Sequence, residues 1–340
     1  MIEGPILAIE TSCDETAAAV VEGRHAVGSV VASQAELHTP YGGVVPEVAA
    51  RQHLGTVNGV VERALSEAGR SLDEIEVVAV TQRPGLIGAL LVGVATAKAL
   101  AYAAGKPLAM VDHLHGHVCA VWLEPVALDP PFVSLIASGG HTRLDHVLDY
   151  ERPVQLGQTL DDAAGEAIDK GARTLGLPYP GGPALERLAR DGDREAFDFP
   201  VALAGRTEAD FSFAGVKTSL LYAVRELGED GAREARADLA ASYQEAVMRP
   251  LADRLVDAAV RLSAPAVSIG GGVAANGRLR ELVRERAEAA GVDVAAPAMS
   301  LCTDNAAMIG AAAHFTPVIP WPDYVGEDAV PTAPPGGVAA

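Results

Sequence analysis

The chain has 340 residues and a formal net charge of −19 at pH 7, with 26 Lys and Arg against 45 Asp and Glu. This length exceeds what one compact core usually contains, so two domains are expected. A content of 49% hydrophobic residues excludes an intrinsically disordered chain. The acidic balance argues against a protein that holds nucleic acid by an overall positive field, because phosphate binding depends on Lys and Arg.

Cysteine usage and the apolar segments predict a cytoplasmic protein. Cys13, Cys119 and Cys302 are widely spaced and odd in number, which suggests no disulfide framework. The N-terminus shows neither a basic region nor a long apolar run. The apolar stretch 86–104 is interrupted by glycines and Lys98, so we expect a buried helix there and no membrane span.

The first half of the chain alternates strands and helices. Its expected elements are, in chain order, a strand over 5–9, a polar turn, a strand over 17–21, a helix over 48–68 ended by Gly69, a strand over 77–80, a long small-residue helix that ends near Gly105, and a strand over 108–111. The second half repeats this order. The segment 132–148 predicts strand, glycine turn and strand, and the segment 265–291 predicts strand, glycine turn and helix.

We therefore expect an α/β protein with two duplicated halves. A proline cluster within 124–131 marks the boundary between them. The expected division is an N-terminal lobe over 1–128, completed by a C-terminal helix over 304–316, and a C-terminal lobe over 129–303. The Pro-, Gly- and Ala-rich segment 317–340 is expected to be an irregular tail.

The sequence His113-Leu114-His115-Gly116-His117 carries the sharpest local signal. His113 and His117 are four residues apart, so a helix places both imidazoles on one face, where they can hold one metal ion. A histidine-rich helix start is the alternative, and spacing alone leaves both open. The HExxH pattern of zinc proteases is absent. Asp304 is a candidate third ligand, although it also fits an ordinary helix N-cap.

Glycine turns form the second signal. Ser138-Gly139-Gly140 follows a strand, and 270–272 lies between a strand and a helix. Neither matches a Rossmann or P-loop motif. Each one alone is usually only a turn. At matching points of two duplicated halves, they suggest a phosphate held between the lobes by backbone amides.

The remaining polar residues favour metal-assisted group transfer without a covalent intermediate. Asp162, Glu166 and Asp169 fall on one helical face, which is either a solvated face or a place that binds ligand hydroxyls such as those of ribose. Cys13 lies beside acids that raise its thiol pKa, and no GxSxG motif is present.

Ten motifs in a fixed order closely resemble one bacterial family. They are IETSCDET, YGGVVPE, RPGLIGALLVG, DHLHGH, SGGHT, DDAAGEAIDK, YPGGP, DFSFAGVKT, GGGVAAN and CTDNAAM. The family is the tRNA threonylcarbamoyladenosine biosynthesis family TsaD, formerly described as O-sialoglycoprotein endopeptidase, and the resemblance runs from about residue 6 to 313. It implies a two-lobed fold of the actin-like, sugar kinase and heat-shock ATPase type, with duplicated mixed-sheet domains.

The resemblance also implies an activity. The expected reaction transfers threonylcarbamoyl from threonylcarbamoyl-AMP to the exocyclic amine of adenosine 37 in tRNAs that read codons beginning with A, and AMP leaves. The family's metal ligands match His113, His117 and Asp304, which implies one divalent metal per chain, foremost iron(II), with zinc as the alternative. Asp14 and Glu15 match acids that the family places at the cleft, and Glu15 is a hypothetical acceptor of the amine proton.

The resemblance further assigns the adenylate. The matching positions are Ile136, Ala137, Ser138, Gly139, Gly140, Asp169, Gly182, Glu186 and Asn276. The implied partners are tRNA, a paralogous actin-fold subunit and a small ATPase. The acidic chain must then hold tRNA by a local basic strip, by its partners, or by both. Candidates for that strip are Arg51, Arg83, Lys217 and Arg278, where Arg83 replaces a glycine that is usual in the family.

Overall fold

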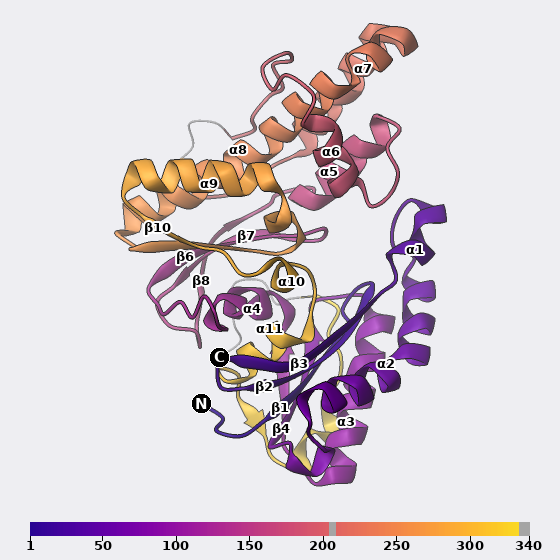
Figure 1. Cartoon of the computed structure of the whole chain (residues 1–340), viewed down its shortest axis with the longest axis vertical. Helices are drawn as coiled ribbons and strands as arrows, with labels where there is room; N and C mark the ends of the chain where they lie inside the picture. The colour runs from indigo at the N-terminus through magenta and orange to yellow at the C-terminus, as the bar shows by residue number, and fades with distance from the viewer. Residues whose placement is uncertain (204–208, 333–340) are drawn as a thin grey trace. The chain divides into compact units, whose positions relative to one another are not determined.

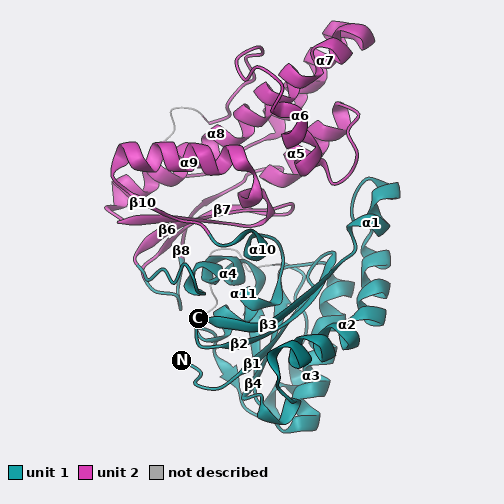
Figure 2. Ribbon diagram, in the orientation of Figure 1, with its two compact units in different colours: residues 1–130, 149–153, 297–340 teal, residues 131–148, 154–296 magenta. Residues whose placement is uncertain are grey.

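The computed structural model describes residues 1–203 and 209–332, which belong to two compact units (Figure 2). Unit 1 contains residues 1–130, 149–153 and those from 297 onward, and unit 2 contains 131–148 and 154–296. Compared with the expected division, the short segments 149–153 and 297–303 and the C-terminal tail all belong with the N-terminal unit.

Unit 1 is built on a six-stranded mixed sheet in the order β11-β5-β4-β1-β2-β3, of which Figure 1 labels β1 to β4. Its strands are β1 (Ile6–Glu10), β2 (Glu15–Glu22), β3 (His25–Ser33), β4 (Val77–Arg83), β5 (Leu108–Asp112) and β11 (Val318–Ile319). Its α-helices are α1 (Ala35–His38), α2 (Pro46–Ala68), α3 (Ile87–Ala104), α4 (His113–Cys119), α10 (Met299–Cys302) and α11 (Ala306–Ala313). Short 3-10 turns are η1 (Thr39–Tyr41), η2 (Leu72–Glu74), η3 (Ala120–Trp122) and η5 (Asp323–Gly326).

Unit 2 is built on a five-stranded mixed sheet in the order β10-β9-β6-β7-β8. Its strands are β6 (Phe132–Ala137), β7 (Thr142–Val147), β8 (Val154–Gln158), β9 (Ala266–Gly270) and β10 (Asp293–Ala295). Its helices are α5 (Ala164–Thr174), α6 (Gly181–Ala189), α7 (Ala214–Glu234), α8 (Arg236–Leu262), α9 (Gly277–Ala290) and the 3-10 turn η4 (Gly272–Ala275). Helix α8 packs on β6 and β9, and α9 packs on α8.

The two sheets confirm the duplication expected from the sequence. In unit 1, β1 pairs antiparallel with β2 and parallel with β4, and β4 pairs parallel with β5. In unit 2, β6 pairs antiparallel with β7 and parallel with β9, and β9 pairs parallel with β10. The loop after β1 and the turn after β6 therefore hold equivalent places in the two units.

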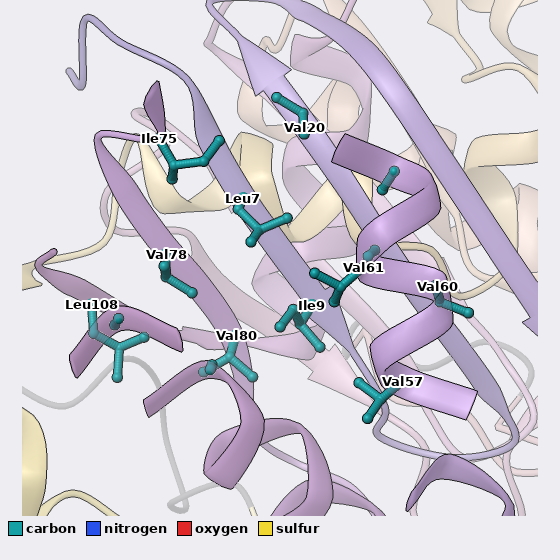
Figure 3. Close-up of a cluster of buried hydrophobic side chains, with 14 of the residues drawn as sticks. Leu7, Ile9, Val20, Val57, Val60, Val61, Ile75, Val78, Val80 and Leu108 are labelled. Carbon is teal, nitrogen blue, oxygen red and sulfur yellow. The ribbon is translucent and has the colours of Figure 1, made fainter. Parts of the chain in front are cut away.

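The core of unit 1 lies between the sheet and helices α2 and α3 (Figure 3). Leu7 and Ile9 of β1 point toward Val57 and Val61 of α2, because alternate residues of a strand share a face. Helix α2 ends where Gly69 adopts a left-handed conformation, as the sequence predicts. Burial of this aliphatic set supplies the apolar free energy that orders the β1–β2 hairpin.

Helix α11 packs on the opposite face of the same strands at very close range. A Cβ atom added at Gly310 would lie 2.5 Å from Cγ2 of Val21 and 3.4 Å from Cβ of Ala8. Only glycine permits this approach of helix and sheet. The contact holds α11, and with it the loop that precedes it, against the middle of the sheet.

Helix α3 is less buried than its sequence predicts. Among the described residues, α3 alone is long and apolar enough to cross a membrane, and 33% of α3 is buried. The core helix of a soluble protein can have the same length and composition. One face packs on α2 and β4, while Ile87, Leu91 and Tyr102 are exposed. The helix expected to be buried is therefore buried on one face and exposed on the other.

The segment 317–332 is ordered against unit 1, and 333–340 lie outside the described residues. Strand β11 pairs antiparallel with β5, and the buried Tyr324 donates a hydrogen bond to the carbonyl of Lys106. Farther on, the amide of Val330 donates to the carbonyl of Gln82. Much of the expected irregular tail thus extends the first unit.

The close packing of α11 predicts opposite effects for two glycine-to-alanine changes. Gly310→Ala should lower the free energy of unfolding by about 1–3 kcal/mol, because the added methyl overpacks the contact with Val21. Gly55→Ala, inside α2 with open space around it, should raise this free energy by about 0.5–1 kcal/mol. Urea denaturation of both variants checks this, and an unchanged or raised stability of Gly310→Ala would contradict the packing argument.

Candidate functional site

Helix α4 presents two histidines at its start. The carboxylate of Asp112 caps the helix by accepting hydrogen bonds from the amides of Leu114 and His115 at 2.9 and 3.2 Å. This cap fixes the first turn, so His113 and His117 lie on one face, with ring centroids 4.8 Å apart. His115 points elsewhere, as expected, and its Nε2 lies 2.6 Å from the carbonyl oxygen of Tyr150.

Asp304 joins this pair and does not cap α11. The cap is Asn305, whose side chain accepts a hydrogen bond from the amide of Met308 at 3.0 Å. Asp304 Oδ1 instead lies 3.2 Å from His117 Nε2 and 3.5 Å from His113 Nε2. The alternative interpretation of Asp304 as a helix cap is therefore wrong.

A glycine inside the histidine motif lets α4 and α11 approach each other. A Cβ atom at Gly116 would lie 2.8 Å from Cδ1 of Ile309. The helix that carries the histidines can therefore pack directly on the helix that follows Asp304. This close packing brings residues nearly 200 positions apart in the sequence into one cluster.

The cluster of His113, His117 and Asp304 fits a divalent metal ion. The three ligand atoms lie within 4.8 Å of one another. Metal–ligand bonds of about 2.1 Å in tetrahedral geometry give ligand separations of about 3.4 Å, close to the two distances to Asp304. Both ring nitrogens of His117 are buried; Nε2 faces Asp304 Oδ1, and Nδ1 has no partner among the described residues. A buried imidazole in this state fits a metal ligand.

A fourth residue, Glu10, contacts the ring nitrogen of His113 that faces away from Asp304. Its side chain is fully buried at the end of β1, and its Oε2 lies 2.9 Å from His113 Nδ1. Oε2 also accepts a hydrogen bond from the hydroxyl of Thr81, and Oε1 accepts one from the amide of Ser12. The carboxylate therefore holds His113 with Nδ1 toward β1 and Nε2 toward Asp304. Sequence analysis missed Glu10, although an acid that directly continues an apolar strand is a usable signal.

Charge inside the cluster is set by burial and by neighbouring acids. Burial opposes ionisation of Glu10, but the adjacent His113 lowers the pKa of this carboxyl. Burial also opposes protonation of His113, whereas Asp304 and Glu10 raise its pKa to about 9. Burial lowers the pKa of His117. Two acids thus flank one histidine, and the other histidine stays neutral.

The two acids that the sequence singles out stand where the loop after β1 meets β2: Asp14 ends the loop and Glu15 begins the strand. Burial raises the pKa of Glu15 to about 7, and the charges of Asp14 and Asp304 add to this effect. Oε1 of Glu15 accepts a hydrogen bond from the hydroxyl of Ser33, while Oε2 is buried without a partner among the described residues. Burial, followed by the charge of Asp14, raises the pKa of Cys13, which agrees with the expectation that its thiol is no nucleophile.

In unit 2, the turn after β6 presents glycine amides. The amide of Ser138 donates to the carbonyl of His141 and closes a tight turn. Within the described chain, Gly139 and Gly140 make no such hydrogen bond, and a Cβ atom added at either glycine would meet no other atom. Ile136 and Ala137 are buried residues of β6. Of the expected amide donors, the amide of Ser138 is therefore already hydrogen-bonded to His141, whereas the amides of the two glycines can bind an anion.

The other expected adenylate residues of unit 2 form two small groups. Oδ1 of Asp169 accepts a hydrogen bond from the amide of Gly181 at 2.9 Å, next to Gly182. Glu186 accepts one from the amide of Gly277, beside Asn276. The side chain of Asn276 caps α9. Turn backbones are thus held by the side chains expected to bind the ligand.

Asp161 and Asp162 precede α5 and are both paired, whereas Glu166 on α5 pairs with Lys170 and keeps an exposed side chain. Asp162 forms ion pairs with Lys170 and Lys217. Asp161 accepts hydrogen bonds from the amides of Phe213 and Ala214 at the start of α7. These contacts join the DDAAGEAIDK and DFSFAGVKT motifs.

The four candidates for a basic strip are all paired with acids. Lys217 pairs with Asp162, as described above, and Arg278 pairs with Glu245 and Glu281. Arg51 and Arg83 pair with Glu47 and Asp112, respectively.

The contact between Glu10 and His113 predicts a metal-binding defect. Glu10→Gln should weaken the affinity for a divalent ion about 10- to 100-fold, because a carboxylate behind a histidine ligand orients the ring and strengthens it as a donor. Titration with Zn²⁺ against a chromophoric competitor measures this affinity. The control Glu22→Gln, on β2 of the same sheet, should bind the ion as the unaltered chain does. Equal affinity in Glu10→Gln would contradict the orienting role.

Comparison with known proteins identifies the family. The family model for TsaD, tRNA N6-adenosine threonylcarbamoyltransferase, matches residues 25–311. A tRNA N6-adenosine threonylcarbamoyltransferase of Anaeromyxobacter sp. is 53% identical over 309 residues, which cover 90% of this chain and 92% of the relative. Its namesake from Clostridium perfringens is 49% identical over 311 residues, which cover 91% and 92%.

Among solved structures, HypF of T. kodakarensis is similar with a TM-score of 0.62 at 16% identity, over 92% of this chain and 47% of HypF. This likeness concerns the fold alone and confirms the expected actin-like and sugar kinase class. Because the family model matches most of the chain and these relatives are about 50% identical over about 90% of it, the chain belongs to the TsaD family of tRNA N6-adenosine threonylcarbamoyltransferases and is a tRNA-modifying transferase.

Proposed function

We propose that the chain transfers threonylcarbamoyl from threonylcarbamoyl-AMP to the exocyclic amine of adenosine 37, beside the anticodon of tRNAs that read codons beginning with A. AMP is the other product. The proposal is supported above all by the close approach of the side chains of His113, His117 and Asp304 in a chain of this family. A cluster of two imidazoles and a carboxylate leaves coordination positions open for a substrate.

His113, His117 and Asp304 would hold one divalent ion. Iron(II) is the first candidate and zinc the second, because two histidines and one carboxylate suit both. A bound ion supplies Lewis-acid polarisation of a carbonyl or phosphoryl oxygen. Glu10 orients the first of these ligands, and Asp112 holds the helix that carries two of them.

In this proposal, unit 2 binds the adenylate. The amides of Gly139 and Gly140 donate hydrogen bonds to the phosphate oxygens, and the space beside both glycines, where a Cβ atom would meet no atom, supports this role. Asp169 and Gly182 bind the ribose. The base lies near Glu186 and Asn276. Ile136, Ala137 and Ser138 contribute by shaping the backbone that precedes the glycines.

We propose Glu15 as the acceptor of the amine proton. The amine nitrogen attacks the carbamoyl carbon, the bond from that carbon to the phosphate oxygen breaks, and AMP leaves with the electron pair. The released proton passes to Oε2 of Glu15, whose buried and unpartnered state supports this role. Asp14, whose pKa burial also raises, is the second candidate. No protein nucleophile takes part.

Charge distribution bears on how tRNA binds. Unit 1 has 8 Lys and Arg against 21 Asp and Glu, whereas unit 2 has 18 against 24. Contacts to the tRNA backbone are therefore proposed for unit 2 and for partner proteins. The four basic residues named from the sequence already pair with acids, so they contribute less than their charge indicates.

We further propose a cytoplasmic complex with a paralogous actin-fold subunit and a small ATPase. The exposed side chains of Leu54, Ile87 and Leu91 on α2 and α3 offer an apolar surface of the kind that protein partners cover. A peptidase of the HExxH type is disfavoured, since no such motif exists in the sequence. A small-molecule kinase would leave the histidine cluster unexplained.

The metal cluster predicts a loss of transfer. In cells depleted of the protein, His113→Ala and Asp304→Ala should each leave the threonylcarbamoyl modification of tRNA below detection, because each removes a metal ligand. Nucleoside mass spectrometry of tRNA from cells depleted of the protein and supplied with each variant measures the product. His25→Ala, an exposed histidine of β3, serves as the control and should restore modification. Full activity of either ligand variant would rule out the metal role.

The raised pKa of Glu15 predicts a pH dependence. A base must be ionised to accept a proton, so kcat/KM should rise with pH through an apparent pKa of about 7. Glu15→Gln should lower kcat about 100-fold or more and remove this rise. The other charged groups that act on Glu15 are Asp14 and Asp304, so Asp14→Asn should move the midpoint and keep the rise. A rise that persists in Glu15→Gln would assign the proton to another group.

A further inference from the structure

A buried histidine from another element contacts the chain on both sides of Asp14 and Glu15, where the loop after β1 meets β2. We propose that His53 of α2 is a positioning residue for these two acids. It sets their orientation by hydrogen bonds to the backbone before them and to a side chain after them. This inference rests on the proposed role of Glu15 as proton acceptor.

His53 makes one contact on each side of the acid pair. Its Nε2 lies 2.9 Å from the carbonyl oxygen of Cys13, and its Nδ1 lies 2.8 Å from the hydroxyl of Thr16. A carbonyl oxygen only accepts hydrogen bonds, so Nε2 carries the hydrogen. Nδ1 then accepts from Thr16. The neutral imidazole therefore satisfies both contacts with a single tautomer.

Burial keeps His53 in this neutral state. The residue is fully buried, and burial lowers its pKa. The charges that act on the ring are those of Glu10, Asp14 and His38. Protonation would turn Nδ1 from an acceptor into a donor and break the contact pattern.

The end of β3 supports the same loop from the other side. The amide of Gln34 donates to the carbonyl of Asp14 at 3.0 Å, and its side-chain nitrogen lies 3.3 Å from Nδ1 of His53. The neighbouring Ser33 donates to Oε1 of Glu15. Glu15 is thus contacted from the last residue of β3 and Asp14 from the residue after it, and His53 links this set to α2.

Helix α2 gives His53 a rigid base. One turn farther along, Val57 belongs to the buried cluster that joins α2 to β1 and β2. A side chain anchored on a packed helix can hold a loop to within a few tenths of an ångström, whereas a loop alone cannot. Without His53, the peptide after Cys13 is free to rotate, and water can reach the buried Oε2 of Glu15.

Two substitutions separate the contacts of His53. In His53→Gln, the amide nitrogen reaches the position of Nε2 and keeps the bond to Cys13. In His53→Asn, the shorter side chain ends near the position of Nδ1, so the bond to Cys13 is lost. His314→Asn provides the matched control, because His314 is a buried histidine of unit 1 with no contact to the loop among the described residues.

The full chain with ¹³C-labelled glutamate is titrated by NMR, with Glu15→Gln to assign the signal, and kcat and KM are measured in the reconstituted system. We expect His53→Asn to lower the pKa of Glu15 from about 7 toward its ordinary value near 4.5. The same variant should lower kcat about 10- to 100-fold with KM for tRNA unchanged, since misplacement of a reacting group acts on the chemical step. His53→Gln should recover most of kcat, and His314→Asn should keep both values.

Unchanged pKa and kcat in His53→Asn would overturn the proposal, as would an equal pKa shift in His314→Asn. A lowered kcat with an unchanged Glu15 pKa would also overturn it. A shifted pKa with an unchanged kcat would support the positioning by His53 and overturn instead the role of Glu15 as proton acceptor.

Discussion

The buried carboxylate of Glu10 is the interaction on which the first unit depends. An ionised carboxylate inside a protein is costly unless every oxygen has a partner. Glu10 meets this demand with Ser12, Thr81 and His113, which come from the loop after β1, from β4 and from α4. One charge therefore fixes three pieces of chain at the place where the metal ligands gather.

The duplicated architecture assigns different chemistry to equivalent positions. Each sheet begins with an antiparallel hairpin next to a parallel strand. In unit 1 the first hairpin connection and its ends contain acids and hydroxyls, and side chains of α2 and β3 contact it. In unit 2 the corresponding connection contains two glycines, whose amides make no backbone hydrogen bond within the described residues. The same fold thus presents carboxylates in one copy and backbone donors in the other.

Ion pairing changes the meaning of the acidic composition. Most cations lie in unit 2, and many of them hold helices together, as Lys217 and Arg278 do. A lysine or arginine that already compensates an acid releases fewer counterions when it meets a phosphate. The net charge of this transferase therefore describes its overall electrostatic field and says little about which substrate it binds.

Local pattern was sufficient for much of the fold and part of the site. Apolar runs and glycine stops located β1, α2 and α3, and the spacing of four between His113 and His117 predicted a shared helical face. These features depend on neighbours in sequence. The edge strands β3, β8 and β10 were missed, because their exposed residues blur the alternation.

The sequence by itself determined the family, the α/β class, the duplication and the identity of the residues that can ligate a metal. Only the tertiary structure decided between the alternative roles that the sequence left open for single residues. Asp304 is a metal candidate because Asn305 takes the cap, and Ser138 is no free donor because His141 closes its turn. The roles of Glu10 and His53 are contacts between segments distant in the chain. Such contacts arise from packing, as where Gly116 lets α4 meet α11, and no local periodicity encodes them.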